Sequence, residues 1–419
     1  MKILFCTMQF GPGYNQGTEK YIRNLALNLS AQGCDVVVAG GDPGGILADG
    51  GIDVGIDTNI RQITLPTFGW STLYGGSINS YITLLSELKP DVVHMANPAH
   101  IGINILRASQ KLGIPYFISV TDFWWLCPKH TLTLKSRDFC RGFQSTQQCM
   151  RCIAETHPNR LIRAAAHFPS FRDRITEFLI AKNTRTKAAQ EWLERKQILA
   201  AVLRNAQQVI CLSKTGKKLL SGYFSISNCR YIPAGLADIW FDSGKVTQRK
   251  RESFVVGFLG AVAPHKGLHT LCLALQELDQ PDVQLRIAGK LVSRRYAKRC
   301  LGQYSRTQYV GELNELESRD FIDDLDLLVI PSNSPENQPQ VLLEAGARQK
   351  PTIASNIPGC AELLPKSALF PVDDFNQLKQ LLEKAKQEVS SVGLPEVGSS
   401  AKDVSAQILT EYRNGVIKQ

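Results

Sequence analysis

Two carboxylates and one ammonium group stand in loops that enter apolar, helix-like segments. Glu336 and Glu344 lie on either side of Pro339, in the stretch that follows the apolar run ending at Pro331. Lys266 stands in a second loop of the same kind. Carboxylates accept hydrogen bonds from hydroxyl groups, and an ammonium group attracts phosphate. The three side chains therefore fit a ligand that carries both hydroxyls and phosphate.

The helix after Pro339 offers further donors. Proline suits the first turn of a helix, where its missing amide costs no hydrogen bond. The amides of Gln340, Val341 and Leu342 should then be free to bind an anion such as phosphate. Glu344 lies about one turn further on, where a carboxylate can accept two hydrogen bonds from a vicinal diol. Phosphate, diol and sugar hydroxyls together indicate a sugar nucleotide.

A structural explanation stands beside each of these interpretations. A Glu near a helix start is favoured by the helix dipole alone, which accounts for Glu336 and Glu344 without a ligand. Lys266 at a helix start is disfavoured by roughly 0.3–1 kcal/mol unless an anion is near, but a solvated surface position also relieves this cost. These alternatives remain open at the level of sequence.

The N-terminal part contains two similar loop positions. A glycine-rich turn from Gly11 to Gly17 joins a strand to a helix and offers backbone amides, although a structural tight turn is an equal alternative. Asp122 follows the predicted strand Pro115–Val120 and is a candidate base or acceptor-binding group. A helix cap is the alternative for Asp122.

These loops belong to an alternation of apolar runs and amphipathic stretches. The alternation predicts a parallel sheet with helices on both faces, and it occurs twice along the chain. The predicted elements of the first series include Lys2–Phe10, Thr18–Gln32, Asp35–Gly41, Ser77–Lys89, Asp91–Ala96, Ile101–Leu112 and Pro115–Val120. Those of the second include Phe254–Gly260, Gly267–Leu278, Val283–Ala288, Leu327–Pro331, Pro339–Arg348 and Asp374–Glu388.

The fold class is therefore α/β, with two doubly wound, Rossmann-like domains that face a cleft. We expect an N-terminal domain over residues 1–235 with a helical, basic insertion at about 123–206, and a C-terminal domain over 236–400. A final helix over 401–419 is expected to pack back on the first domain, because an isolated helix of this length is unstable.

Composition limits the class of protein. The chain has 419 residues, of which 43% are hydrophobic and 21% charged, an ordinary globular composition. Because no apolar run reaches the ~18 to 20 residues of a spanning helix and no cleavable leader is evident, we expect a cytoplasmic protein. The net charge of +10 is concentrated in residues 123–235.

That basic segment suggests an anionic partner. Apolar residues are interleaved with the charges, so the segment can rest on an anionic membrane surface where a lipid-linked acceptor resides. A plain solvated helical face is an equal alternative, and nucleic acid is disfavoured because no recognition module accompanies the charge. The basic residues of the segment include Arg160, Arg163, Arg172, Arg174, Lys182, Arg185, Lys187, Arg195 and Lys196.

Four of the eleven cysteines crowd into the insertion. Only the last two have strong metal-ligand spacing, so a structural zinc site competes with reduced thiols in a loop. The four are Cys127, Cys140, Cys149 and Cys152.

Taken together, the loops resemble the retaining GT-B glycosyltransferases of family 4, over nearly the whole chain. The Glu336 to Glu344 segment, followed by Pro351-Thr-Ile-Ala-Ser and Pro358-Gly, resembles the donor-binding signature of that family. Other landmarks occur in the family's order. They are Gly17-Thr-Glu19, Pro90-Asp-Val-Val-His94, Thr121-Asp122-Phe-Trp-Trp and Pro264-His-Lys266-Gly.

The resemblance implies transfer of a sugar from a nucleotide-diphosphate sugar to a glycan or lipid-linked acceptor, with retention and without a catalytic metal. It implies that Glu344 holds the ribose, Glu336 the sugar hydroxyls and Lys266 the diphosphate. The catalytic candidates are Glu336, Lys266 and Asp122. The donor-binding candidates are Gly17, Lys266, Asn337, Gln340, Val341, Leu342 and Glu344, and the acceptor-side candidates are Glu19, His94, Thr121 and Asp122.

Three positions depart from the family pattern. Thr121 stands where a His is common, Ala261 where an Arg is common, and Ala234 where an Asn is usual. Loss of an Arg weakens diphosphate binding by roughly 1.5–3 kcal/mol if nothing compensates. The departures leave open an inactive, partner-binding homologue, and a sugar-nucleotide epimerase on the same fold is a further alternative.

Overall fold

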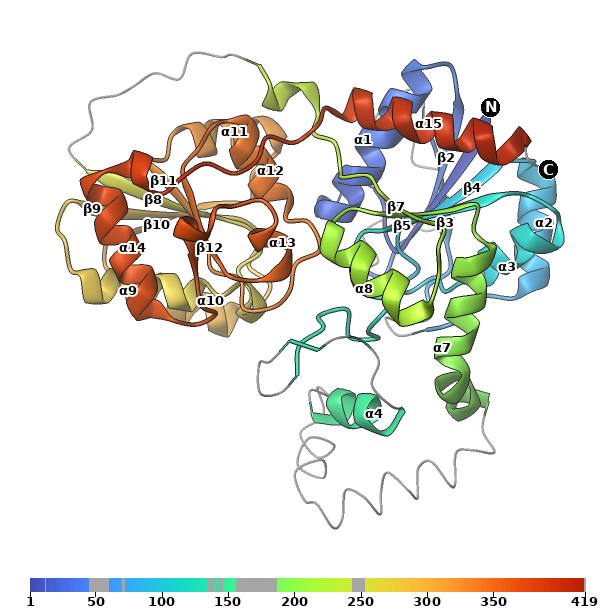
Figure 1. Ribbon diagram of the computed structural model, residues 1–419, viewed down its shortest axis with the longest axis horizontal. Coiled ribbons are helices and arrows are strands. Elements are labelled where there is room, and N and C mark those ends of the chain that lie inside the picture. The colour runs from blue at the N-terminus through green and yellow to red at the C-terminus, as the bar shows by residue number, and fades with distance from the viewer. Residues whose placement is uncertain are drawn as a thin grey trace, which may run out of the picture. The chain divides into compact units, whose positions relative to one another are not determined.

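The computed structural model contains two compact units (Figure 1), one formed by Met1–Ile232 together with the chain from Val404 onward, the other by Pro233–Asp403. We call them unit 1 and unit 2. The structure describes residues 1–11, 13–44, 60–69, 72–134, 139–140, 142, 146–155, 187–242 and 253–417.

Unit 1 is built on a seven-stranded sheet in which every pairing is parallel. Its inner strands are short, buried runs rich in Val, Ile and Phe, the residue types that suit strands covered on both faces. The strand order is β3-β2-β1-β4-β5-β6-β7. The bounds are β1 Lys2–Thr7, β2 Asp35–Gly41, β3 Arg61–Leu65, β4 Val92–Met95, β5 Tyr116–Val120, β6 Gln208–Cys211 and β7 Cys229–Tyr231.

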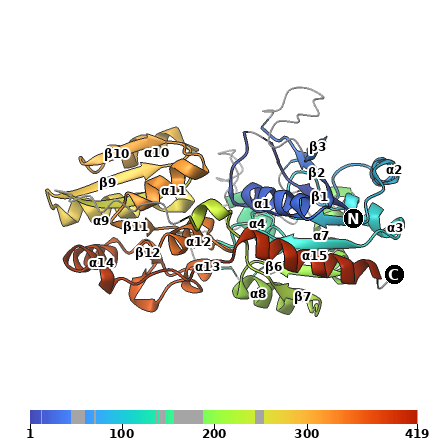
Figure 2. The ribbon, with the colours of Figure 1, turned by 90° about the horizontal axis from the view of Figure 1, so that it is seen from above.

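Helices cover the two faces of this sheet, as the view from above shows (Figure 2). The first helix, α1, buries Tyr21, Ile22 and Leu25, which share one face at helical spacing. The bounds are α1 Gly17–Ala31, α2 Ile78–Leu88, α3 Asn104–Lys111, α4 Thr146–Glu155, α7 Lys187–Asn205, α8 Lys214–Phe224 and α15 Ala401–Ile417.

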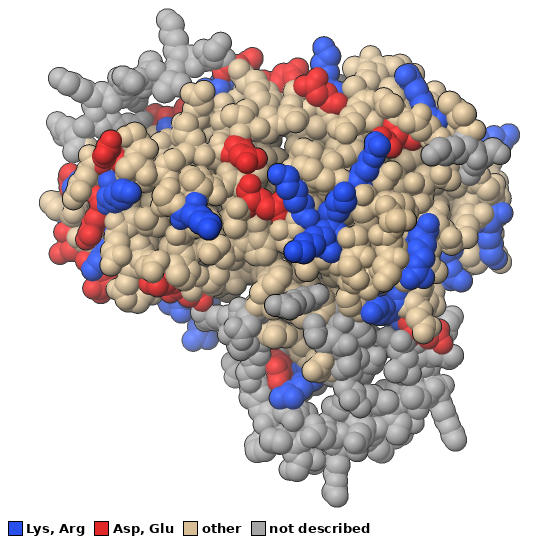
Figure 3. Space-filling view, in the orientation of Figure 1, with Lys and Arg blue, Asp and Glu red and all other residues tan. Residues whose placement is uncertain are grey.

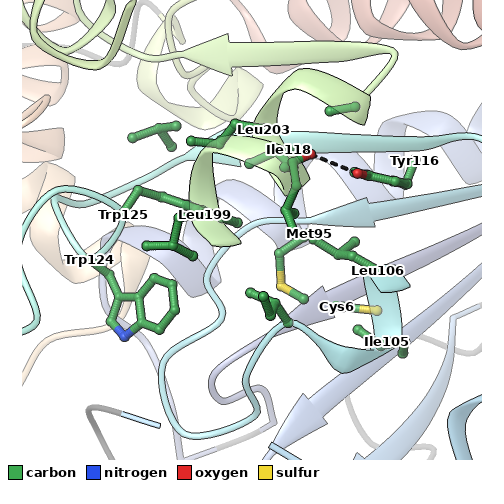
Figure 4. Close-up of a cluster of buried hydrophobic side chains, with 14 of the residues drawn as sticks. Cys6, Met95, Ile105, Leu106, Tyr116, Ile118, Trp124, Trp125, Leu199 and Leu203 are labelled. Atoms are coloured by element: carbon green, nitrogen blue, oxygen red, sulfur yellow. Dashed lines mark hydrogen bonds between the residues drawn. The ribbon is translucent and has the colours of Figure 1, made fainter. Parts of the chain in front are cut away.

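The core of unit 1 lies between the sheet and its helices (Figure 4). Leu199 and Leu203 of α7 pack against Met95 and Ile118 of the central strands, and all four are buried. The Tyr116 hydroxyl donates to a backbone carbonyl of α7 at 2.7 Å, so its polar end is satisfied inside the core. This packing fixes the ends of β4 and β5, where polar side chains begin.

From Val404 onward, the C-terminal helix α15 belongs to unit 1, where it lies close to α1 (Figure 2). Its Ser405 hydroxyl accepts a hydrogen bond from Gln32 at 2.8 Å. Tyr412 of α15 is fully buried and meets the Phe117 ring of β5 edge-on at 4.9 Å. This aromatic contact anchors the helix on the sheet.

Unit 2 repeats the plan with six parallel strands, in the order β10-β9-β8-β11-β12-β13. The strands are β8 Phe254–Leu259, β9 Val283–Ala288, β10 Thr307–Gly311, β11 Leu327–Ile330, β12 Thr352–Ser355 and β13 Leu369–Phe370. The helices are α9 Leu268–Leu278, α10 Arg294–Leu301, α11 Glu315–Asp323, α12 Gln340–Ala347, α13 Pro358–Ala361 and α14 Phe375–Gln387. Short 3-10 turns occur at Asp238–Trp240, Pro264–Lys266, Lys366–Ala368 and Val389–Ser391.

In each sheet, the winding direction reverses beside the first strand. The reversal falls between β1 and β4 in unit 1 and between β8 and β11 in unit 2. Loops diverge at such a switch point, so ligands of doubly wound proteins bind there, beyond the carboxyl ends of the strands. The two switch points are therefore where functional side chains are expected.

The predicted α/β class with two Rossmann-like folds is confirmed. One strand was missed: β3 is a short edge strand that begins with the exposed Arg61, and it lacks the apolar run that marks the other strands. Within the described ranges, none of the helices combines the length and the apolar character needed to span a bilayer.

Candidate functional site

The switch point of unit 2 brings Lys266 and Glu336 together. Lys266 follows β8 and Glu336 follows β11, and the Lys266 Nζ lies 2.6 Å from the Glu336 Oε1. The Ser332 hydroxyl donates to the same oxygen at 2.8 Å. Both charged side chains are mostly buried, with 28% and 17% of their surface exposed. Sequence alone singled out the two charged residues, and the structure shows that they form one site.

The two loops that carry this pair are locked to each other. Asn333 donates from its backbone to the His265 carbonyl at 3.0 Å and from its side chain to the Pro264 carbonyl at 3.0 Å. Gly267 has a φ of +67°, and a Cβ there would lie 1.8 Å from the Pro331 carbonyl oxygen. Only glycine allows this approach. Lys266 is thereby held beside the end of β11.

The electrostatics keep Glu336 ionised. Burial opposes its charge, but the Lys266 ammonium and the hydrogen bonds from Lys266 and Ser332 more than compensate, so the pKa of Glu336 is lowered. An ammonium group has three donors. Lys266 therefore retains donors for a ligand while it holds Glu336.

At the start of α12, the prediction that the Leu342 amide is free to bind an anion is wrong. Pro339 precedes the helix as its N-cap residue. The Leu342 amide donates back to the Pro339 carbonyl at 3.0 Å, so it is not free for an anion as the sequence had suggested. Gln340 and Val341 supply the first-turn amides that can receive phosphate.

Two further donor-binding candidates are buried. Glu344 lies on α12 and is only 2% exposed, and Asn337 is 6% exposed. A buried carboxylate must be hydrogen-bonded or paired, and neither Glu344 nor Asn337 is without an interaction partner. Gly359 lies close to this region, since a Cβ there would come within 2.4 Å of the Glu336 carbonyl oxygen.

The switch point of unit 1 carries neutral groups instead. The Thr18 hydroxyl, at the start of α1, donates to the Thr121 hydroxyl at 3.0 Å. The Thr121 hydroxyl in turn donates to the Ala96 carbonyl, just beyond β4, at 3.2 Å. These contacts connect the ends of β4 and β5 to the first turn of α1.

Asp122 lies next to this chain of hydroxyls. Its Oδ2 accepts from the Asn97 side chain at 2.8 Å, and its Oδ1 accepts from the Trp124 amide at 2.8 Å. Asp122 is half-buried. The amide contact closes a local turn and is not the helix cap that sequence offered as the alternative, because none of the described helices begins there, and the carboxylate retains lone pairs for a further donor.

Two acceptor-side candidates are fully buried. Glu19 accepts from the Gln16 amide at 2.9 Å in a capping box of α1, and burial raises its pKa. His94 hydrogen-bonds to the Tyr412 hydroxyl and, at 2.8 Å, to the Ser119 hydroxyl. Both side chains stabilise unit 1 in these contacts. Gly17 is the first residue of α1.

The four cysteines of the insertion are reduced. Cys152 accepts from the Lys129 ammonium at 3.2 Å, and Cys140 donates to the Gly142 carbonyl at 3.1 Å. Among the residues that the structure describes, no three His, Cys, Asp or Glu side chains converge on a common point suited to a metal ion. The structural zinc site expected from the sequence stays a prediction.

The structure changes the interpretation of two residues of the basic segment, Arg195 and Lys196. Arg195 is 4% exposed, with its guanidinium 4.3 Å from the centre of the Trp124 ring, so it is a buried cation–π partner and not part of a surface. Lys196 covers the Tyr223 ring at 4.2 Å. Residues 156–186, with most of the predicted basic face, lie outside the described residues. The described face of unit 1 still presents many Lys and Arg (Figure 3), and on α8 the exposed ones are Lys214, Lys217 and Lys218.

Comparison with known proteins identifies the class. Residues 241–417 match the family described as Glycosyl transferases group 1, and residues 15–158 match Glycosyltransferase Family 4. The two matches cover parts of both units, and the fold is that of GT-B glycosyltransferases. The chain belongs to the group 1, family 4 glycosyltransferases. No curated protein sequence matches it significantly.

Solved structures show the same fold. Sucrose-phosphate synthase from Thermosynechococcus elongatus is 15% identical with a TM-score of 0.63, over 100% of this chain and 94% of that one. HepE of Anabaena, solved with UDP-glucose, is 15% identical with a TM-score of 0.60, over 100% and 99%. TarM of S. aureus, solved with UDP and alpha-GlcNAc-glycerol, is 11% identical with a TM-score of 0.60, over 99% and 100%.

Three residues of these sites were missed by sequence analysis. Ser332 and Asn333 stand in the same Pro331-Ser-Asn-Ser segment as Glu336, so their polar character directly after a buried strand was an available signal. Asn97 follows the strand that carries His94. Its position at a strand end was the comparable signal in unit 1.

Proposed function

We propose that the protein is a retaining glycosyltransferase that moves a sugar from a nucleotide-diphosphate sugar to a hydroxyl of a glycan or lipid-linked acceptor, in polysaccharide or glycolipid biosynthesis. The observation that carries the proposal is the Lys266–Glu336 pair at the switch point of unit 2. It offers a cation for the diphosphate and a carboxylate for sugar hydroxyls, next to the first-turn amides of α12.

In the proposed reaction, the bond between the anomeric carbon and the diphosphate oxygen breaks. The bond from that carbon to the acceptor oxygen forms on the same face, and the departing phosphate takes the proton of the acceptor hydroxyl. Lys266 and the amides of Gln340 and Val341 stabilise the negative charge that develops on the diphosphate. Glu336 orients the sugar through its hydroxyls, and Glu344 holds the ribose of the donor.

The acceptor is assigned to unit 1. Asp122 has both oxygens oriented by neutral donors and keeps lone pairs for an acceptor hydroxyl. The Thr18–Thr121 pair lies beside it and adds hydroxyl groups of the kind that saccharides bind.

The test is a transfer assay with a panel of UDP-, GDP- and ADP-sugars, in which donors are first screened by thermal shift. A bound ligand at 100 times its dissociation constant stabilises the protein by about 2.7 kcal/mol. We expect one nucleotide class to bind and transfer, and the anomeric configuration of the product, read by NMR, to match that of the donor. An inverted product or the absence of donor binding would contradict the proposal.

Metal independence is part of the proposal. Lys266 and the helix-start amides supply positive charge at the diphosphate, which is the role a divalent cation has in other transferases. We expect transfer to continue at an unchanged rate in EDTA. A loss of activity that added magnesium or manganese restores would contradict this part.

A further inference from the structure

Asn97 is a buried side chain with both ends in use. It directly follows Ala96, beyond the end of β4, and is 1% exposed. Its Oδ1 accepts from the Ala99 amide at 3.0 Å, which closes a turn of the backbone. Its Nδ2 donates to the Asp122 Oδ2 at 2.8 Å. The turn fixes the rotamer of Asn97, and the fixed rotamer aims a donor at Asp122.

The Asp122 carboxylate is oriented without being neutralised by these contacts. The donors that hold it are an amide side chain and the Trp124 backbone amide, one on each oxygen. His130 lies close enough for the charge of Asp122 to act on it, but burial dominates and lowers the pKa of His130. Burial therefore disfavours a positive charge on His130 near Asp122.

We propose that Asn97 is a positioning residue of the acceptor site, which holds the Asp122 carboxylate in the orientation that receives a saccharide hydroxyl. The inference rests on the proposed function, since it requires that Asp122 bind the acceptor. It assigns Asn97 a role in acceptor recognition, because its side-chain donor is spent on Asp122, an acceptor-side candidate.

The sharpest variant is Asn97→Asp. It keeps the oxygen that accepts from the Ala99 amide, so the turn is preserved, but it removes the donor to Asp122. We expect the KM for the acceptor to rise about tenfold at pH 8, while the KM for the donor changes less than about twofold.

Asn97→Ala removes both hydrogen bonds and should also raise the acceptor KM. Ser109→Ala is the matched control, because Ser109 is fully buried in the same unit and makes one hydrogen bond, to the Ile114 carbonyl at 2.8 Å. It should leave both KM values unchanged.

The outcomes separate the inference from the proposed function. A rise in acceptor KM in Asn97→Asp, with the donor KM and the Ser109→Ala control unchanged, supports the role of Asn97. An unchanged acceptor KM, or an equal rise in the KM for donor and acceptor, overturns it while the enzyme itself remains a transferase. A wild-type protein that transfers no sugar from any donor overturns the proposed function and this inference with it.

Discussion

The two switch points have the same topology but different chemistry. In unit 2, a mostly buried ammonium and carboxylate meet at 2.6 Å. In unit 1, hydroxyls and a side-chain amide surround a single carboxylate. Ionic groups suit a charged diphosphate, whereas neutral donors and acceptors suit sugar hydroxyls. One folding plan thus supplies two sites, and the side chains that follow the strands decide what each binds.

The largest effect is expected from Lys266→Ala. This variant removes the cation at the diphosphate and leaves Glu336 without its partner. We expect the rate of transfer to fall by about 10²- to 10³-fold, the effect of removing one donor that stabilises transition-state charge. Steady-state kinetics with the donor found by screening measures it. Near-ultraviolet circular dichroism of the variant should match the wild type, and a rate within threefold of wild type would contradict the charged character of the unit 2 site.

Glu336→Gln should have the next largest effect. The substitution keeps the shape of the side chain but loses a charged acceptor, which costs about 1.5–3 kcal/mol, or about 10- to 150-fold in rate. Glu312→Gln, on the exposed surface of the same unit, is the control and should have no effect. Equal turnover of the two variants would remove the assigned role of Glu336.

The protonation of His94 tests whether the buried polar network of unit 1 is uncharged. Burial lowers its pKa to about 3 in the folded protein, from about 6.5 when unfolded. Below about pH 6.5, the unfolded chain binds a proton that the folded chain excludes. The contribution of the neutral, buried His94 to the free energy of unfolding is therefore fully present above this pH. It is lost as the pH falls, by up to about 1.4 kcal/mol for each pH unit.

Denaturant unfolding at a series of pH values measures this loss. The comparison is with His94→Gln. Between about pH 6.5 and 5, the free energy of unfolding of this variant should depend less steeply on pH than that of the wild type, by a slope that corresponds to nearly one proton. If both proteins lose stability equally over this range, the folded His94 is protonated and the buried network of unit 1 is charged.

The smallest expected effect is the dependence of the donor KM and the acceptor KM on salt concentration. Binding of the donor at a charged site should weaken as ionic strength rises, whereas binding of a neutral acceptor at unit 1 should not. We expect the donor KM to increase a few-fold between about 0.05 and 0.5 M NaCl, with the acceptor KM constant. A stronger salt dependence for the acceptor than for the donor would reverse the comparison.

Much of the fold could be predicted from the sequence, because buried parallel strands are continuous apolar runs and amphipathic helices separate them. The edge strand β3, over Arg61–Leu65, escaped because half-exposed strands lack such a run. Lys266 and Glu336 were found because charged side chains directly after buried strands are conspicuous. That they form a pair depends on the order of strands β8 and β11, which periodicity does not reveal.

Other positions needed coordinates. The Leu342 amide is consumed by a tight turn at Pro339, a detail of cap geometry that the residue types leave undetermined. His94 reads as a candidate site residue in sequence, yet its partner Tyr412 is far away along the chain. Arg195 likewise reads as a surface charge until the Trp124 ring is seen beneath it. In each case, the contact that decides the role is distant in sequence or lies in backbone geometry.

The central claim is that the Lys266–Glu336 switch point of unit 2 binds the diphosphate of a nucleotide. Calorimetric titration of UDP, GDP and ADP into the wild-type protein and into Lys266→Ala tests it without an acceptor. We predict that at least one nucleotide binds the wild type and binds the variant at least tenfold more weakly, the loss expected for a charged hydrogen bond. Equal affinity in the two proteins, or no binding of any nucleotide to the wild type, would contradict the claim.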